Sequence, residues 1–350
     1  MDAVISFVKE NPTCAFFYAL GGFTFLKFAI KTLVVFSETF VLPGTNLKNF
    51  GAGKGSWAGR DRCTFLCIAR LTRWIVVTGA SDGIGREYAI QLAKKGFNVL
   101  TVARNETALK SVTDEIASGT QGKAQSKTVV LDVSKSDHPG WEQLQQVLSE
   151  IRVSVLVNNV GKSHAHPVYF AEAESSELSD IIAINVNATV RITRMVLPGM
   201  VKQQNGLVLN IGSFSGVVPS PMLATYSGAK AFIDTFSTAL AEEVQKDGIL
   251  VQCINPYFVV SKMSKIRKPS VMIPTPDAFV RASLNKVGLS GGARFVGRPA
   301  ASAPYWSHSL LEYFIGVLGW KQATVVYSHK LHRSIRKRVD KKLAREAKAQ

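Results

Sequence analysis

Acidic residues are scarce in this sequence, which leaves a large excess of positive charge. Its 350 residues include 25 Asp and Glu against 42 Lys and Arg, a formal net charge of +17 at pH 7. A basic chain can bind nucleic acid, but here Lys and Arg cluster near the C-terminus and flank apolar segments, without alternating with aromatic residues. This pattern favours anionic lipid or a phosphate-bearing substrate as partner and argues against nucleic acid.

Cysteine is scarce as well, with four residues in the chain. Cys14, Cys63, Cys67 and Cys253 show no CxxC spacing and no neighbouring pair of histidines. The spacing therefore indicates neither a zinc site nor a disulfide framework, and we expect reduced thiols and no bound metal.

Long apolar runs are rare, and the clearest one lies near the N-terminus. The stretch 14–36 spans 23 residues, enough to cross a bilayer, and its only charges are Lys27 and Lys31. A cleaved signal peptide is the alternative, but no small-residue cleavage pattern follows, and the charges lie toward the C-terminal side of the run. We expect a transmembrane anchor at 14–36, a short lumenal segment at 1–13 and a cytosolic remainder, according to the positive-inside rule.

Between residues 75 and 299, apolar strands alternate with helical stretches. This alternation predicts right-handed crossovers and a doubly wound, parallel α/β sheet of the Rossmann type, with helices on both faces. The expected strands are 76–78, 98–103, 129–133, 153–161, 207–212 and 249–255. The segment 37–74 before them contains several glycines and is predicted to be a linker.

The turn after the first expected strand contains Gly79, Gly83 and Gly85 in a Gly-x-x-x-Gly-x-Gly spacing. Between a strand and a helix, this spacing lets backbone N–H groups and the positive helix end face a pyrophosphate; an ordinary glycine turn is the alternative. The second expected strand ends in Arg104, where many such folds have an acid that binds a ribose 2′-hydroxyl. Because an arginine suits a 2′-phosphate instead, the sequence predicts NADPH as the cofactor.

A hydroxyl, a phenol and an ammonium are spaced so that they can converge. Tyr226 and Lys230 lie four residues apart in an expected helix from 225 to about 246, so they share one face. The ammonium is expected to lower the pKa of the phenol, and Ser213, after an apolar strand, can donate to the same substrate oxygen. A Tyr-x-x-x-Lys spacing alone is common on surface helices, so its weight depends on the motifs around it.

Two more features lie near this set. Asn185, within a long helical region from about 175 to 201, is either a satisfied core amide or the holder of a water molecule near the site. After the last expected strand, a basic loop begins at Pro256 and carries Lys262, Lys265, Arg267 and Lys268. That loop can meet the phosphates of coenzyme A, although a solvated charge run or a lipid contact is an equal alternative.

Taken in order, these motifs resemble those of the short-chain dehydrogenase/reductase family over residues 75–298. The match comprises the glycine-rich turn, Asn158-Asn-x-Gly161, Asn185, Ser213, Tyr226-x-x-x-Lys230 and the Asn255-Pro256 turn. Val160 and Tyr257 depart from the usual family pattern. With the N-terminal apolar segment, these departures resemble the microsomal very-long-chain 3-oxoacyl-CoA reductases, which are related to the type 12 17β-hydroxysteroid dehydrogenases.

The resemblance implies NADPH-dependent reduction of very-long-chain 3-oxoacyl-CoA to 3-hydroxyacyl-CoA, the second step of fatty-acid elongation. It implies that Tyr226 protonates the developing alkoxide and that Lys230 supports the phenol and binds the nicotinamide ribose. Ser213 would hydrogen-bond the carbonyl oxygen, and Asn185 would order a relay water. The implied cofactor contacts are Gly79, Ser81, Asp82, Gly83, Ile84, Gly85, Arg104, Asp132, Asn159, Gly161, Tyr226, Lys230, Pro256, Val259 and Ser261.

The same resemblance implies an endoplasmic reticulum membrane protein whose catalytic domain faces the cytosol. Its implied partners are membrane lipid and the condensing enzyme, dehydratase and enoyl reductase of elongation. A ketosteroid or 3-ketosphinganine reductase with the same catalytic set is an alternative. A non-catalytic, cofactor-binding membrane scaffold is another, but the intact catalytic set argues against it.

The C-terminal part combines an apolar stretch, 305–320, with a basic one, 329–350. The apolar stretch is short and polar for a span, which favours an interfacial helix over a second crossing. We expect 300–327 to associate with the membrane and 328–350 to form a basic cytosolic tail.

One segment does not fit the resemblance. In the family, Gly-Ser-Trp-Ala runs directly into Val-Val-Thr-Gly, whereas here Ala58 and Val76 are separated by the seventeen residues 59–75. The segment is basic, lacks an amphipathic period and contains two of the four cysteines. We interpret it as a retained intron in the predicted gene, with a lineage-specific insertion as the alternative.

Overall fold

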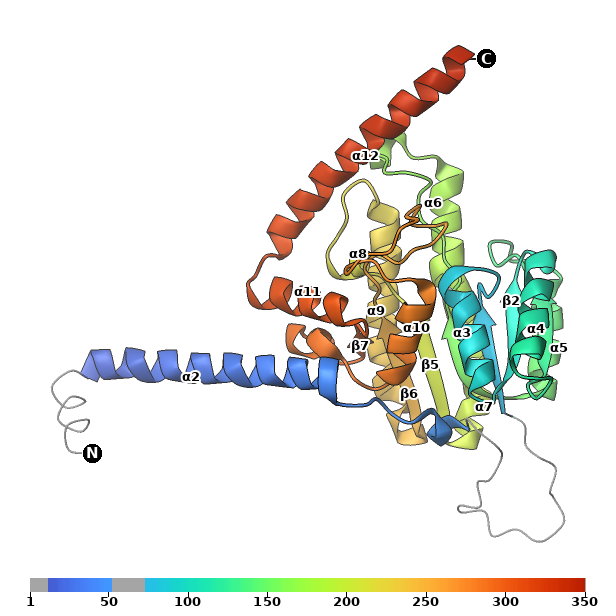
Figure 1. Cartoon of the computed structure of the whole chain (residues 1–350), viewed down its shortest axis with the longest axis horizontal. Coiled ribbons are helices and arrows are strands. Elements are labelled where there is room, and N and C mark those ends of the chain that lie inside the picture. Colours follow the sequence, from blue (N-terminus) through green and yellow to red (C-terminus); the bar gives the residue numbers. More distant parts are fainter. Residues whose placement is uncertain (1–11, 52–72, 350) are drawn as a thin grey trace, which may run out of the picture.

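The computed structural model describes residues 12–51 and 73–349 and contains one parallel, seven-stranded sheet (Figure 1). The strand order is β3-β2-β1-β4-β5-β6-β7. The strands are β1 Arg73–Thr78, β2 Asn98–Ala103, β3 Ser126–Val130, β4 Arg152–Asn158, β5 Gly206–Ile211, β6 Ile249–Ile254 and β7 Ala301–Ser302. The order reverses between β1 and β4, so the ligand crevice is expected at the carboxyl ends of these strands. The predicted doubly wound class is confirmed.

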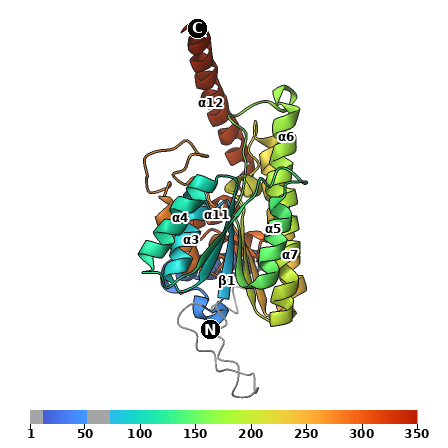
Figure 2. The same ribbon diagram turned by 90° about the vertical axis from the view of Figure 1, so that its right-hand side faces the viewer.

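Helices cover both faces of the sheet (Figures 1 and 2). One layer contains α3 Gly83–Lys94, α4 Glu106–Gly119 and α10 Pro276–Asn285, and the other contains α5 Gly140–Glu150, α7 Ala188–Gln203 and α9 Ala224–Val244. The remaining helices are α2 Pro12–Phe36, α6 Ser175–Ile182, α8 Phe214–Val217, α11 Trp306–Val317 and α12 Lys321–Ala349.

The alternation of side chains along the strands divides the core into two apolar layers. Ile75 and Val77 of β1 point toward the α3, α4 and α10 layer, whereas Val76 points toward the α5, α7 and α9 layer. Strands buried on both faces need continuous apolar sequence, and the central strands β1, β4 and β5 have it. This rigid sheet places the loops that carry the candidate site.

Helix α2 extends away from the sheet and, with the π-helical turn Ser37–Val41, forms a 30-residue apolar rod (Figure 1). By length and composition alone, this rod is long and apolar enough to cross a membrane. The part of the chain that the structure describes contains no second helix of this kind. Its base is attached to the domain: the buried Glu38 accepts a hydrogen bond from the Gly291 N–H at 2.7 Å, and Thr39 Oγ1 lies 3.0 Å from Ser309 Oγ.

The C-terminal segments form two helices that lie against the domain. Helix α11, expected to lie at a membrane interface, buries Ser307, His308 and Tyr313 within the protein, while Phe314 is 41% exposed. Helix α12, in the expected basic tail, is a continuous helix lying over the carboxyl edge of the sheet (Figure 1). Both helices therefore belong to the folded unit.

The first strand begins three residues earlier than the sequence predicts, at Arg73. Arg73 and Trp74 pair with β4, and Trp74 and Ile75 pair with β2. The last three residues of the interpreted insertion are thus strand residues, because they extend the parallel ladder at the start of β1. The rest of that segment, 59–72, lies outside the described residues.

Candidate active site

The glycine-rich turn lies between β1 and α3 and approaches neighbouring atoms closely. Gly79 and Gly83 have φ values of +63° and +55°, which side-chain-bearing residues rarely adopt. A Cβ on Gly85 would lie 2.3 Å from the carbonyl oxygen of Gly79. Asn159 fixes the turn from β4, since its Nδ2 donates to the carbonyls of Thr78 at 3.0 Å and Gly79 at 3.2 Å.

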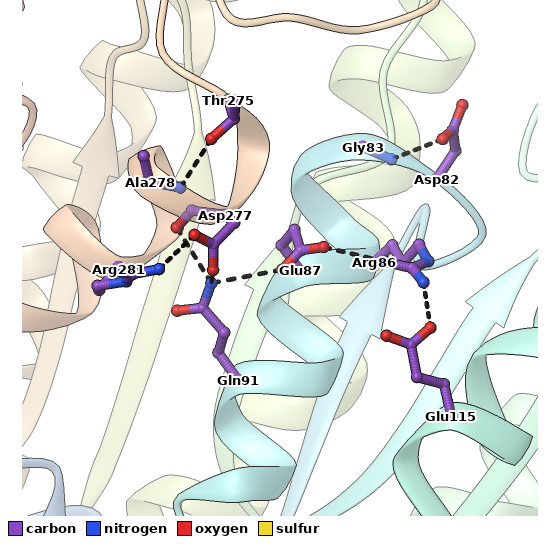
Figure 3. Close-up of polar contacts among 10 residues, drawn as sticks. All are labelled: Asp82, Gly83, Arg86, Glu87, Gln91, Glu115, Thr275, Asp277, Ala278 and Arg281. Carbon is purple, nitrogen blue, oxygen red and sulfur yellow. Dashed lines mark hydrogen bonds and ion pairs between the residues drawn. The ribbon is translucent and has the colours of Figure 1, made fainter. Parts of the chain in front are cut away.

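Space is open in front of the start of α3. A Cβ added to Gly83 would meet only the Ser261 side chain, at 3.9 Å. Asp82 caps the helix by accepting the Gly83 N–H at 2.9 Å, as Figure 3 shows. A dinucleotide pyrophosphate fits this open helix start, and Ser81, Ile84 and Gly161 lie on the same turn or the facing loop.

Polar contacts hold the start of α3 against its two neighbouring helices (Figure 3). Arg86 pairs with Glu87 at 3.0 Å and also with Glu115 of α4. On the opposite side, Gln91 Nε2 donates to a carboxylate oxygen of Asp277 in α10 at 3.1 Å. The turn is therefore positioned by α4 and α10 as well as by the sheet.

Opposite charges lie at the adenosine end of the expected cofactor position. Arg104 is exposed just beyond β2, where it can reach a 2′-phosphate. Asp132, beyond β3, accepts hydrogen bonds from the Ser134 N–H at 3.1 Å and hydroxyl at 2.7 Å. The Ser134 hydroxyl holds the pKa of Asp132 below its usual range against the effect of burial, and Arg104 adds to the lowering.

The hydroxyl, phenol and ammonium are brought together as the sequence predicts. Ser213 follows β5, and it lines the same cavity as Tyr226, which lies in the first turn of α9. Lys230 is one turn further along, and its Nζ donates to the carbonyl of Ile211 at 2.8 Å. Its Nζ lies 5.8 Å from the centre of the Tyr226 ring.

The expected lowering of the phenol pKa is not found. Burial raises the pKa of Tyr226 above its usual range, and the hydrogen bond with Ser213 opposes this only partly. Burial also lowers the pKa of Lys230 to about 8. Desolvation disfavours both charged forms, and at this separation it outweighs the attraction between phenolate and ammonium. Tyr226 is therefore a protonated phenol at neutral pH, ready to act as an acid.

Asn185 lies in a π-helical turn, Ala183–Asn187, between α6 and α7. Such turns often occur at functional sites. Its Nδ2 donates to the carbonyls of Lys162 at 2.7 Å and Ile181 at 2.8 Å, while its Oδ1 is buried with no hydrogen-bond partner. A Cβ on Gly161 would lie 3.1 Å from that oxygen and 3.6 Å from Lys230 Nζ. The glycine thus leaves room between amide and ammonium for a bridging water.

The loop after β6 forms one wall of the candidate site. Pro256 accepts a hydrogen bond from the Phe214 N–H at 2.8 Å, and Val259 is buried. Ser261 Oγ accepts the Ser264 N–H at 3.0 Å. Lys262, one of the basic residues on this loop, forms an ion pair with Asp82 at 3.2 Å.

A cavity of about 340 Å³ opens beside Ser213 and Tyr226. The other side of the cavity is formed by one face of α12, whose lining residues we call the α12 stripe: Tyr327, Leu331, Ile335 and Val339. Sequence reasoning missed these residues because the many Lys and Arg around them indicated a solvated tail. Their spacing of four was the available signal.

A polar chain behind Ser213 was also missed. The Ser213 N–H donates to Asn255 Oδ1 at 3.0 Å, and Asn255 Nδ2 contacts Asp234 at 3.4 Å. Arg298 holds both oxygens of Asp234, at 2.7 and 2.8 Å, and also pairs with the buried Glu312 of α11. No short motif identifies this chain, since its members come from five separate segments.

The arrangement agrees with comparisons to known proteins. Two fungal proteins named very-long-chain 3-oxoacyl-CoA reductase are similar over nearly their whole length. The one from Coprinopsis cinerea is 52% identical over 350 residues, covering 100% of this chain and 98% of the relative. The one from Laccaria bicolor is 51% identical, covering 99% and 97%.

Solved structures with bound cofactor share the fold. A short chain dehydrogenase from Shigella flexneri complexed with NADP is 27% identical, with a TM-score of 0.56, covering 66% of this chain and 95% of that one. An NAD(P)-dependent gluconate 5-dehydrogenase from Beutenbergia cavernae with bound NADP is 26% identical, with a TM-score of 0.57, covering 67% and 96%. The family profile described as short chain dehydrogenase matches residues 73–270. The chain therefore belongs to the short chain dehydrogenase family.

Proposed function

We propose that this protein is an NADPH-dependent reductase of very-long-chain 3-oxoacyl-CoA. The observation that carries the proposal is that Ser213 and Tyr226, with the buried Lys230 one turn further along α9, line a cavity with many apolar lining residues. Whole-length similarity to proteins named for this activity supports it. The product is the 3-hydroxyacyl-CoA of the fatty-acid elongation cycle.

The residues divide the work of carbonyl reduction. The chemistry that bound NADPH supplies is hydride transfer to the 3-keto carbon. Ser213 donates a hydrogen bond to the carbonyl oxygen and Tyr226 transfers its hydroxyl proton there, so the carbonyl becomes an alcohol. Lys230 stabilises the phenolate that remains, and a water held by Asn185 Oδ1 returns the proton from solvent.

The cofactor is held along the carboxyl edge of the sheet. The glycine-rich turn with Ser81, Asp82 and Ile84 holds the pyrophosphate, and Arg104 binds the 2′-phosphate. Asp132 binds the adenine side of the cofactor, and Asn159 holds the glycine-rich turn in place. The nicotinamide end is lined by Gly161, Pro256, Val259 and Ser261. The open space before Gly83 and the positive φ values at Gly79 and Gly83 support this placement.

The N-terminal rod and the resemblance support a membrane location. We place α2 across the endoplasmic reticulum membrane, with residues 1–13 lumenal and the catalytic domain in the cytosol. Exposed aromatic and aliphatic side chains on α11 and before α12, among them Trp306, Leu318 and Trp320, then face the membrane surface. There the protein meets the condensing enzyme, dehydratase and enoyl reductase of elongation.

The experiment that tests the activity is a substrate panel. Membranes containing the full chain are incubated with NADPH and with 3-oxoacyl-CoAs, 3-ketosphinganine and ketosteroids, and NADPH oxidation is followed. We expect the highest kcat/KM for long-chain 3-oxoacyl-CoA. A clear preference for a steroid or a sphingoid ketone would overturn the proposal, and no turnover of any ketone would favour a scaffold.

A further inference from the structure

We propose that α12 determines acyl-chain specificity, because the acyl chain lies against the α12 stripe while the 3-keto group is at Tyr226. This inference rests on the proposed function, since it takes the substrate to be an acyl thioester. Helix α12 lies outside the segment matched by the family profile, which ends at residue 270.

The first observation is continuity between the stripe and the catalytic residues. One cavity is lined by Ser213 and Tyr226 and also by Leu331, Ile335 and Val339. Tyr327 and Val339 lie twelve residues apart along the α-helix, a distance of about 18 Å. The stripe is therefore long and narrow, a shape that suits an extended alkyl chain better than a compact ring system.

The second observation is that the stripe lies outside the apolar core clusters of the domain. Among the described residues, none of the four stripe side chains belongs to an apolar core cluster of the domain. Apolar side chains that face a cavity gain free energy when an apolar occupant displaces water from them. An acyl chain provides such an occupant, and its length sets how much of the stripe is covered.

The third observation is that α12 is fixed in place by contacts beside the stripe. His332 is buried, and its Nδ1 donates to the carbonyl of Pro221 at 2.7 Å, just before α9. Arg336 pairs with Glu172 at 3.4 Å, and the ring of His329 meets that of Tyr169 edge-on at 6.2 Å. These contacts hold the wall at a set distance from Tyr226, so that enlarging a stripe residue shortens the space for substrate.

The test uses Leu331→Trp and Ile335→Trp, with Arg333→Trp on the exposed side of α12 as the matched control. For each full-length variant, kcat/KM is measured for acetoacetyl-CoA and 3-oxostearoyl-CoA, and NADPH binding is measured by fluorescence. For Leu331→Trp and Ile335→Trp, we expect the ratio of long-chain to short-chain kcat/KM to fall by about tenfold or more. The ratio should stay at the wild-type value in Arg333→Trp, and NADPH binding should be unchanged in all three.

The outcomes separate the inference from the proposed function. If the wild type reduces neither thioester, the proposed function fails. If it reduces them but both tryptophan variants keep the wild-type ratio, or lose both substrates equally, the role of α12 is wrong while the activity stands.

A labelling experiment on the wild type avoids any folding defect of a variant. A 3-oxoacyl-CoA with a photoreactive diazirine at the distal end of its chain is bound with NADP⁺ and irradiated. We expect adducts on peptides from residues 321–349, and adducts confined to other segments would overturn the inference.

Discussion

At the scale of single residues, burial shifts the pKa values of Tyr226 and Lys230 in opposite directions. Tyr226 and Lys230 are both buried, and desolvation favours the neutral form of each. A reductase needs a proton donor at the developing alkoxide, and a neutral phenol beside Ser213 meets that need. The pair is therefore suited to ketone reduction in its resting state.

Tyr226→Phe should abolish ketone reduction while leaving NADPH binding nearly intact, because it removes only the proton-donating hydroxyl. The loss should be roughly a hundredfold or more in kcat. Steady-state rates and NADPH fluorescence titration measure the two effects. Wild-type turnover in this variant would show that Tyr226 is not the acid.

Arg104→Asp should shift cofactor preference from NADPH toward NADH. The exchange removes a charge-assisted hydrogen bond to the 2′-phosphate, worth about 2 kcal/mol, and adds an acceptor for a 2′-hydroxyl. The ratio of kcat/KM for the two cofactors measures the shift, and Arg104→Lys is the charge-preserving control. An unchanged ratio in Arg104→Asp would mean that the phosphate is bound elsewhere.

His308 should make stability depend on pH. Burial lowers its pKa from the usual 6.5 to about 4, and its Nε2 lies 3.0 Å from the carbonyl of Met272. Because the unfolded chain takes up the proton first, the stabilisation is complete above pH 6.5 and is lost as the pH falls toward 4, by about 3 kcal/mol.

The measurement is the thermal unfolding midpoint in detergent between pH 7.5 and 4.5, for the wild type and His308→Asn. The variant lacks the titrating ring, so the wild type should lose more of its midpoint than the variant does on acidification. Parallel curves for the two proteins would contradict this role.

At the scale of elements, the structure shows which groups the basic residues of the loop after β6 contact, whereas the sequence allowed several partners for them. Lys262 pairs with Asp82 yet remains 88% exposed as a side chain, and Lys265 bonds the carbonyl of Ala165. Exposed ion pairs of this kind contribute little to stability, so a phosphate can replace the partner at small cost. The loop therefore stays a candidate for the coenzyme A phosphates.

Neutralising Lys262, Lys265, Arg267 and Lys268 together should raise KM for acyl-CoA more than for a truncated thioester that lacks the nucleotide. Steady-state kinetics with both substrates test this. An equal rise for both substrates would leave only a solvated charge run.

At the scale of the whole molecule, segments outside the shared family region join the N-terminal rod to the active site. The base of α2 bonds α11 and the turn at Gly291, and Arg298 connects Glu312 of α11 to Asp234. The chain from Asp234 through Asn255 ends at the backbone of Ser213. The N-terminal rod and Ser213 are thus parts of one connected structure.

The segment 59–75 remains a prediction about the chain itself. If it is a retained intron, a tryptic peptide of the native protein should cross a junction between Ala58 and Val76. Since Arg73–Ile75 form part of β1, such a protein would place Trp57 and Ala58 in the strand instead. Mass spectrometry of the purified native protein measures this, and any peptide from within 63–70 would rule the interpretation out.

The sequence by itself determined six of the seven strands, the glycine-rich turn and the placement of Tyr226 and Lys230 one turn apart on one helix. These depend on spacing within one strand or one helical turn, which the periodicity of the chain expresses directly. The start of β1 was misplaced because pairing with β4 extended a strand whose first residues are not all apolar.

Only the tertiary structure decided the rest of the site. The contact between His332 and Pro221 joins residues 111 positions apart, and that between Arg298 and Asp234 joins residues 64 apart. No local pattern encodes such distances, so the place of α12 over the cavity could not be predicted. The raised pKa of Tyr226 also depends on the tertiary structure. The neighbouring charge of Lys230 was visible in the sequence, but the burial that raises the pKa depends on how the whole chain packs.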